Sequence, residues 1–354
     1  MLDFLYRALR PALFSIDAER AHVATLRSLG AAPRMWAALA ATTMGAPPVS
    51  LARDVAGLKF AGPIGLAGGL DRDGVAIGFW PSLGFGFIEV GSVTAHPQTG
   101  NQRPRLFRLE AERGLINRMN RNRGSAELAA RLRELRERGR APEVPIGVVI
   151  GKSALTPLEE ATADFVTSTK RLAGLADYLS VNVSSPTTPG VRALQDHRAL
   201  SELLPAVIEA AAETPVFVKL SPDLEDDEIT SLVDHVVELG VAGVIATNTT
   251  TRRDVLTGRG DAGGGEGGGL SGAPLWPLAR HCIQTVLDAA AGRVPVIGVG
   301  GVERAEQAQE LLDAGCAAVQ LYTALVYRGP GLPNRINAQL ADRNRALHPL
   351  DAHA

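Results

Sequence analysis

The sequence predicts an α/β protein built as a (β/α)8 TIM barrel, preceded by an N-terminal extension of two helices. The chain has 354 residues and a hydrophobic content of 45%, and short apolar runs alternate with helical patterns along most of it. A single barrel can reach this length. An open, doubly wound sheet is the alternative that the same alternation allows.

Eight apolar or small-residue runs account for the expected strands. They span residues 63–67, 86–90, 145–150, 178–181, 215–220, 242–246, 294–299 and 317–321. Helical patterns separate most of them, for example at 128–139, 158–172, 225–239 and 305–314. Short apolar runs bounded by turn residues, with helices between them, indicate a parallel sheet.

Charge balance and cysteine count exclude several functional classes. Lys+Arg 36 against Asp+Glu 38 gives a net charge of −2, so no global basic field favours nucleic acid. The arginine-rich stretch 131–140 also contains glutamates and is typical of a solvated helix face. The two cysteines lack metal-site spacing, and no metal is expected. No run reaches the ~18 apolar residues of a transmembrane helix, and no signal peptide is evident, so we expect a location on the cytosolic side.

Residues 1–48 form a distinct segment. Leu5, Leu9 and Leu13 recur at near-helical spacing among arginines, and Asp17 can cap a second helix. Two such helices can form a lid packed on the body, or lie in a membrane interface, where apolar side chains and arginines occur together. Pro47-Pro48 ends the segment. The expected domains are therefore the extension at 1–48 and the barrel at 49–345.

Small polar residues and glycines follow the apolar runs. The most distinctive stretch is Val181-Asn-Val-Ser-Ser-Pro-Thr-Thr-Pro-Gly190, whose prolines exclude both a helix and a central strand. Comparable ends lie at 68–74, 91–94, 151–152, 219–222, 247–250, 298–301 and 322–323. Each end taken alone could be an ordinary βα turn. In a barrel all of them meet at one rim, so together they predict a functional cavity.

Two of these ends indicate a phosphate-bearing ligand. The glycines at 298–301 precede a helix and offer backbone N–H groups to a phosphate. Tyr322 and Thr323 add donors beside them, and Lys219 suits an anionic ring or a carboxylate. The glycine-rich stretch 263–269 either approaches the same ligand or serves as a linker.

Nine short motifs are distributed over nearly the whole chain. They are Asp17-Ala-Glu-Arg-Ala-His22, Gly-Leu-Asp (69–71), Pro104-Arg-Leu-Phe-Arg-Leu109, Leu115-Ile-Asn-Arg-Met119, Ser184-Ser-Pro186, Thr-Asn-Thr-Thr (247–250), Gly-Leu-Ser-Gly (269–272), Gly-Val-Gly-Gly (298–301) and Leu321-Tyr-Thr323. In these motifs the chain resembles the class 2, quinone-dependent dihydroorotate dehydrogenases. The resemblance implies an FMN barrel that oxidises dihydroorotate to orotate and passes the electrons to a quinone. It also implies a tunnel formed by the N-terminal helices and a monomer attached peripherally to the cytoplasmic face of the cell membrane.

The resemblance also assigns roles to individual residues. Ser185 is the catalytic base, and His22 and Arg108 match polar groups at the quinone tunnel. The expected substrate contacts are Arg72, Asn117, Arg121, Asn182, Thr187, Asn248 and Thr249. The expected FMN contacts are Gly68, Gly69, Arg72, Ser92, Asn182, Lys219, Thr247, Gly272, Gly301, Tyr322 and Thr323.

Several positions depart from the family pattern. Arg72 replaces a lysine, Asn120-Arg121 replaces glycine–phenylalanine, and Val149 and Thr187 replace asparagines that contact flavin and substrate. One interpretation is a retuned pocket in which Arg72 or Arg121 binds the substrate carboxylate. Another is a related flavin- and quinone-linked oxidoreductase that acts on a different small substrate. A catalytically silent flavin-binding protein is a third interpretation, against which the retained serine base argues.

Overall fold

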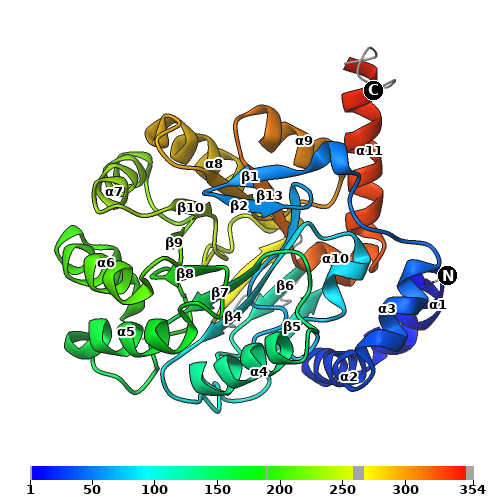
Figure 1. Cartoon of the computed structure of the whole chain (residues 1–354), viewed down its shortest axis with the longest axis horizontal. Coiled ribbons are helices and arrows are strands. Elements are labelled where there is room, and N and C mark those ends of the chain that lie inside the picture. Colours follow the sequence, from blue (N-terminus) through cyan, green and yellow to red (C-terminus); the bar gives the residue numbers. More distant parts are fainter. Residues whose placement is uncertain (1, 189, 258–266, 348–354) are drawn as a thin grey trace.

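The barrel is closed and consists of eight parallel strands, as the computed structural model shows over residues 2–188, 190–257 and 267–347 (Figure 1). The strands are β3 (Ile64–Leu66), β4 (Phe87–Val93), β7 (Ile146–Ile150), β8 (Tyr178–Asn182), β9 (Val216–Leu220), β10 (Gly243–Ala246), β12 (Val296–Val299) and β13 (Ala318–Leu321). The last strand pairs with the first, with Val319 opposite Ile64 and Leu321 opposite Leu66. All eight predicted runs are therefore confirmed, and the open-sheet alternative is wrong.

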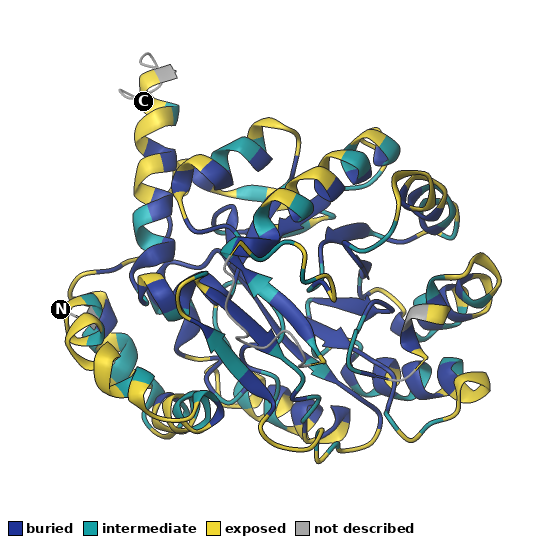
Figure 2. Cartoon of the chain, turned by 180° about the vertical axis from the view of Figure 1, so that it is seen from behind, coloured by how far each residue is buried: buried dark blue, intermediate teal, exposed yellow. Residues whose placement is uncertain are grey.

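Helices surround the barrel and bury one face each against the strands (Figures 1 and 2). They are α4 (Ser125–Glu137), α5 (Ala161–Leu172), α6 (His197–Ala211), α7 (Asp226–Glu238), α8 (Trp276–Ala290), α9 (Ala305–Asp313), α10 (Thr323–Arg328) and α11 (Leu332–Leu347). Helix α7 is an example of this one-sided burial. Its buried residues recur at helical spacing and are Ile229, Leu232, Val233 and Val236. Each such side chain stabilises the fold by roughly 1.5–3 kcal/mol.

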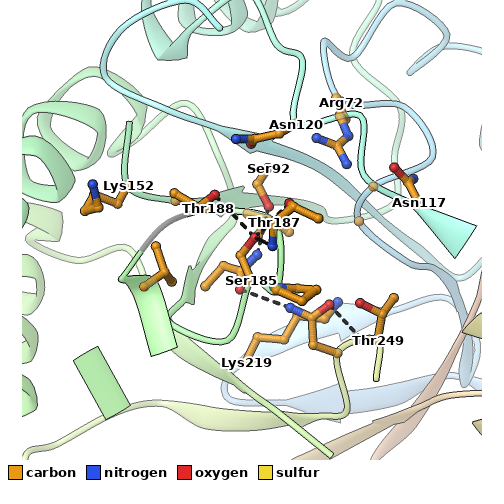
Figure 3. A pocket seen from close by; sticks show the side chains of 18 of the residues that line it. Arg72, Ser92, Asn117, Asn120, Lys152, Ser185, Thr187, Thr188, Lys219 and Thr249 are labelled. Carbon is orange, nitrogen blue, oxygen red and sulfur yellow. Dashed lines mark hydrogen bonds between the residues drawn. The ribbon is translucent and has the colours of Figure 1, made fainter. Parts of the chain in front are cut away.

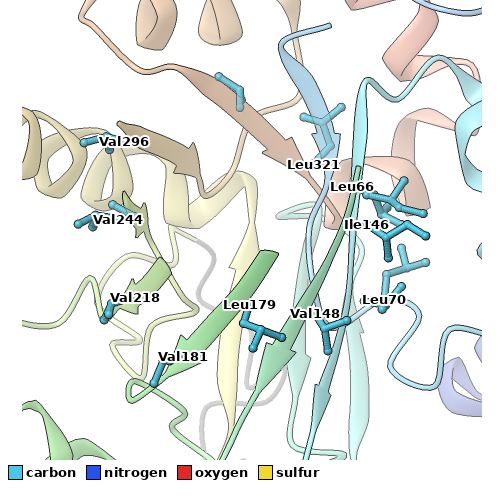
Figure 4. Close-up of a cluster of buried hydrophobic side chains, with 14 of the residues drawn as sticks. Leu66, Leu70, Ile146, Val148, Leu179, Val181, Val218, Val244, Val296 and Leu321 are labelled. Atoms are coloured by element: carbon cyan, nitrogen blue, oxygen red, sulfur yellow. The ribbon is translucent and has the colours of Figure 1, made fainter. Parts of the chain in front are cut away.

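Aliphatic side chains on the outer face of the strands, such as Val148 and Leu179, meet these helices in the main core (Figure 4). The barrel interior is filled differently, with aromatic rings. Phe60 stacks on Phe87 with ring centroids 4.1 Å apart, and Tyr178 lies 5.2 Å from the Phe217 ring. These rings close one end of the barrel, so the polar cavities form at the other end, where the strands finish.

Glycine makes room for the aromatic floor. A Cβ at Gly147 would lie 2.0 Å from the Tyr178 ring, and one at Gly65 would lie 2.2 Å from the Phe87 ring. Phe60 reaches the floor from β2 (Leu58–Phe60), which pairs with β1 (Arg53–Val55) as a hairpin.

A small antiparallel sheet covers part of the rim. It contains β5 (Leu106–Leu109), β6 (Gly114–Asn117) and β11 (Gly269–Gly272), with β6 between the other two. Strands β6 and β11 are far apart in the sequence, and the prediction did not include this sheet. It brings Asn117 and Ser271 over the barrel opening.

The N-terminal segment contains three helices, α1 (Leu2–Ser15), α2 (Ala18–Ala31) and α3 (Pro33–Ala41), where the sequence predicted two. Asp17 caps α2 as expected, since its carboxylate accepts a hydrogen bond from the Arg20 N–H at 2.9 Å. The additional α3 is short and begins at a proline, which suits the first turn of a helix. No helix in the described parts of the chain is long and apolar enough to cross a membrane.

Candidate active site

Two adjoining cavities lie at the carboxyl ends of the strands. The first has a volume of about 100 Å³ and the second about 60 Å³. They share the lining residues Gly68, Lys219, Asn248, Thr249, Ser271 and Tyr322. The two cavities therefore form one continuous cleft, at the rim that the sequence predicted.

Most of the predicted site residues line this cleft. The first cavity holds Gly68, Gly69, Arg72, Ser92, Asn117, Asn182, Ser185, Thr187, Lys219, Asn248, Thr249 and Tyr322. The second adds Thr247, Gly272, Gly301 and Thr323. Asn120 and Val149, which depart from the family pattern, also line the first cavity.

Ser185 lies in the centre of the first cavity, among other hydroxyl groups (Figure 3). Its Oγ is 3.3 Å from Thr187 Oγ1 and 3.4 Å from Thr188 Oγ1. Pro186 fixes the backbone between them. The loop after β8 thus presents a serine with hydroxyl neighbours that can accept or relay a proton.

Beside this serine, a hydrogen-bonded network fixes two side-chain amides. Asn182 Oδ1 accepts from Asn248 Nδ2 at 3.1 Å, and Asn182 Nδ2 donates to Ser92 Oγ at 3.1 Å. Asn248 Nδ2 also donates to Ser184 Oγ at 3.0 Å, while Asn248 Oδ1 accepts from the Thr249 N–H at 2.8 Å. Because each amide is held by its neighbours, the orientation of the polar wall is set before any ligand binds.

Beneath the cleft, Lys219 forms an ion pair with a fully buried carboxylate. Its Nζ lies 3.3 Å from Glu89 Oε1, which also accepts from the Gly68 N–H at 3.2 Å. Tyr178 donates to Glu89 Oε2 at 3.2 Å, and burial, followed by the nearby carboxylate, raises the pKa of this phenol well above its usual value. The sequence analysis missed Glu89, although a glutamate inside an otherwise apolar strand was a visible signal.

The second cavity has the backbone geometry of a phosphate and ring cradle. Gly272 and Gly301 have positive φ angles, and a Cβ there would lie 2.3 Å from Arg113 O and 2.6 Å from Trp276 N, respectively. Only glycine allows such close backbone packing. Gln320, another lining residue that the prediction missed, has both amide atoms buried. Neither atom makes a hydrogen bond of ordinary geometry within the described residues, although the amide lies beside the Tyr178 hydroxyl.

Arg72 lies where the first cavity meets a third one, and it lines both. Burial lowers the pKa of its guanidinium. The third cavity, between α2 and the barrel, also contains His22 and Arg121. Burial, together with the Arg72 charge, lowers the pKa of His22 to about 4, so this imidazole is neutral near pH 7.

Arg121 and Arg108 lie elsewhere than the sequence predicted. Arg121 does not line the first cavity, because Asn120 points into the first cavity and Arg121 points into the third. Arg108 lines none of the three cavities that we describe: it donates to Leu13 O at 2.8 Å and to Ile16 O, and lies 4.7 Å from the centroid of the Phe14 ring. Arg108 therefore attaches the end of α1 to the body. Of the predicted glycine stretch, 263–266 lies outside the described residues, and Gly269 begins β11.

A closed parallel barrel with a polar cleft at the carboxyl ends of its strands has the architecture of a (β/α)8 enzyme. The family model described as dihydroorotate dehydrogenase matches residues 50–343. This chain belongs to the dihydroorotate dehydrogenase family, and its relatives place it in the quinone-dependent class.

Relatives and solved structures agree along the whole chain. A protein of Salinispora arenicola named dihydroorotate dehydrogenase (quinone) is 50% identical, covering 92% of this chain and 96% of the relative. One of the same name from Chloroflexus aurantiacus is 45% identical and covers 97% of each. The crystal structure of Eimeria tenella dihydroorotate dehydrogenase in complex with ferulenol superposes with a TM-score of 0.83 at 31% identity, covering 97% of this chain and 99% of that one.

Proposed function

We propose that this chain oxidises (S)-dihydroorotate to orotate with FMN as cofactor and a quinone as electron acceptor, in the de novo biosynthesis of UMP. The observation that carries the proposal is the position of Ser185 within the first cavity, beside fixed amides and next to the glycine-built second cavity. In this proposal Ser185 is the proton acceptor and the fixed amides bind the substrate ring, along one continuous cleft.

The lining of the second cavity and of the adjoining part of the first fits FMN. Gly272, Gly301 and Thr323 would hold the phosphate end. The flavin would be lined by Gly68, Ser92, Thr247 and Lys219, and the buried Gln320 amide would serve its polar edge. When bound, FMN supplies the two-electron acceptor that the substrate needs. Lys219 lines both cavities, and its ammonium would provide a positive charge that stabilises negative charge on the flavin.

In the first cavity, Ser185 would accept a proton from one carbon of the dihydroorotate ring, and the hydride of the neighbouring carbon would pass to the bound flavin. The Thr187 and Thr188 hydroxyls, both within 3.4 Å of Ser185 Oγ, can pass that proton onward. Asn117, Asn182, Asn248 and Thr249 offer the amide and hydroxyl groups that a pyrimidine ring requires. Arg72 lines the same cavity (Figure 3), and its guanidinium suits the substrate carboxylate.

We assign the quinone to the third cavity and the N-terminal segment 1–48, with the flavin barrel at 49–345. His22 is neutral there and can exchange a hydrogen bond with a quinone oxygen. We propose a monomer attached peripherally to the cytoplasmic face of the membrane, and exposed apolar side chains on α1 and α3 support the contact with lipid. Phe4 is 77% exposed, Leu9 48% and Met35 59%, and such residues beside arginines suit a lipid interface.

Anaerobic mixing of the FMN-loaded protein with dihydroorotate tests the proposal, because bleaching of the flavin absorbance reports hydride transfer directly. We expect rapid bleaching, followed by recovery of the colour on addition of 2-methyl-1,4-naphthoquinone. Flavin that dithionite bleaches but dihydroorotate does not would show that the altered pocket takes a different substrate. A protein that cannot be loaded with FMN would contradict the enzymatic function altogether.

A further inference from the structure

A buried arc of polar side chains lies beneath the cleft and meets it at both ends. It consists of Lys219, Glu89, Tyr178 and Gln320, which belong to β9, β4, β8 and β13. Lys219 lines both the first and the second cavity, and Gln320 lines the second. Glu89 and Tyr178 line none of the three cavities described above. The arc therefore connects two parts of the cleft through groups that do not line it.

Strand alternation explains why a glutamate lies inside the barrel. Along β4, Ile88 and Val90 pack in the main core against the helices, whereas Phe87 belongs to the aromatic floor. Glu89 is two residues after Phe87, so it projects to the same side, one layer nearer the carboxyl ends of the strands. The carboxylate thus occupies the layer between the aromatic floor and the cleft.

The Glu89 carboxylate lies directly behind the wall of the cleft. Its Oε1 accepts a hydrogen bond from the Gly68 N–H at 3.2 Å, and Gly68 lines both cavities. A Cβ at Gly68 would lie only 2.8 Å from the same oxygen. Because Glu89 is fully buried, water screens its charge weakly. The charge therefore acts on a ligand in the cleft without touching it.

The partners of Glu89 balance its charge from two sides. Lys219 Nζ lies 3.3 Å from Oε1, and the Tyr178 hydroxyl donates to Oε2 at 3.2 Å. Burial, followed by the Glu89 carboxylate, raises the pKa of this phenol, which therefore keeps its proton. The ammonium lines the cleft and the carboxylate lies behind it, so Glu89 offsets part of the positive charge that Lys219 presents to a ligand.

We propose that Glu89 is a positioning residue that sets the reduction potential of FMN in the cleft, by holding the Lys219 ammonium at the cleft wall while offsetting its charge. This inference rests on the proposed function. The proposed reaction moves a hydride from the substrate to the flavin and then two electrons and two protons to a quinone, which leaves as the quinol. A high flavin potential favours the first transfer and a low one favours the second. Glu89 lowers the potential that Lys219 alone would produce, and so favours the transfer to quinone.

Glu89→Gln separates the charge of this residue from its geometry. The new amide oxygen can still accept from Lys219 and Gly68, and the amide nitrogen can donate to the Tyr178 hydroxyl oxygen, but the negative charge is lost. Reductive titration against a reference dye measures the midpoint potential of bound FMN. The potential should rise by at least about 30 mV, which corresponds to a tenfold stronger preference for reduced over oxidised FMN.

Tyr178→Phe should shift the same potential in the opposite direction. This variant keeps the carboxylate but removes the hydroxyl proton that offsets part of its charge. The preference for reduced FMN should therefore fall, by about twofold to threefold, since a hydrogen-bond dipole offsets only a fraction of a unit charge. A change that merely loosened the site would move both variants in the same direction.

Leu203→Ala is the matched control for lost stability, because Leu203 is buried on α6 and lines none of the three cavities. Its flavin potential should equal that of the parent. A Glu89→Gln preference within twofold of the parent, or shifts of the same sign in Glu89→Gln and Tyr178→Phe, would overturn the inference. If Glu89→Gln does not retain FMN, Tyr178→Phe is the deciding variant, and a preference that rises or stays unchanged overturns the inference. The titration uses no dihydroorotate, so the inference can fail while dihydroorotate still bleaches the flavin, and it can hold if the substrate is a different one.

Discussion

The serine-containing first cavity and the arginine-lined third cavity meet at Arg72 but satisfy their polar groups in opposite ways. In the first, Asn182, Asn248 and Ser184 bind one another, and their geometry is set by the barrel. In the third, Arg72 and Arg121 have no partner among the described residues. The first cavity is organised before its ligand arrives, which favours chemistry. The third retains two guanidinium groups that no described residue pairs, and one of them has its Nε fully buried.

Substitution of Ser185 tests its role as the general base in the first cavity and should have the largest effect. Ser185→Ala should lower the rate of flavin reduction by dihydroorotate by roughly 10²–10⁴-fold, the range typical of a lost general base. FMN should remain bound, because Ser185 does not line the second cavity. Stopped-flow absorbance measures the rate, and Ser201→Ala on the exposed face of α6 is the control. A Ser185→Ala rate close to that of the parent would remove the serine from the mechanism.

The second prediction concerns the buried ion pair between Lys219 and Glu89 beneath the cleft. Glu89→Gln leaves an ammonium that is only 7% exposed without its counter-ion. Breaking a buried pair in this way costs about 3–5 kcal/mol in the free energy of unfolding, which urea titration of the flavin-free protein can measure. Adding Lys219→Met should recover part of the loss. If the single and double variants are equally stable, the carboxylate does not act through Lys219.

The next prediction concerns the ion pair that holds α2, one wall of the third cavity, against the barrel. Glu19 and Arg105 form a two-point pair, with Nη2–Oε1 at 2.8 Å and Nε–Oε2 at 3.0 Å. Glu19→Gln should lower the free energy of unfolding by about 2 kcal/mol. The loss is smaller than for a buried charge left without any partner, because the Thr99 and Asn101 carbonyls still accept hydrogen bonds from Arg105. The KM for quinone should rise while flavin reduction by dihydroorotate is unchanged. Glu238→Gln, exposed on α7, serves as the control.

The smallest expected effect is a pH dependence due to His22. Its pKa is about 4 in the folded protein and near the ordinary 6.5 when unfolded. The unfolded chain therefore binds more protons between these values, and stability from the neutral imidazole is complete above pH 6.5 and is lost as the pH falls toward 4. Because His22 is partly exposed, we expect on the order of 1 kcal/mol. Urea titration measures the free energy of unfolding of the parent and of His22→Gln at pH 7 and pH 5. Lowering the pH from 7 to 5 should destabilise the parent more than the variant, by about 1 kcal/mol. An equal change in the two proteins would contradict the prediction.

The sequence by itself determined the barrel and its catalytic rim. Strands buried on both faces appear as apolar runs, and in parallel strands every carboxyl end lies on the same side, so local patterns were enough to bring Ser185, Asn248 and Lys219 together. Only the tertiary structure decided the pairing of β6 with β11, the third helix α3 and the partner of Glu89. It also decided that Asn120 and Arg121, adjacent in sequence, face different cavities. These features depend on contacts between segments that are distant in the chain and on the direction in which single side chains point, and neither leaves a periodic trace in the sequence.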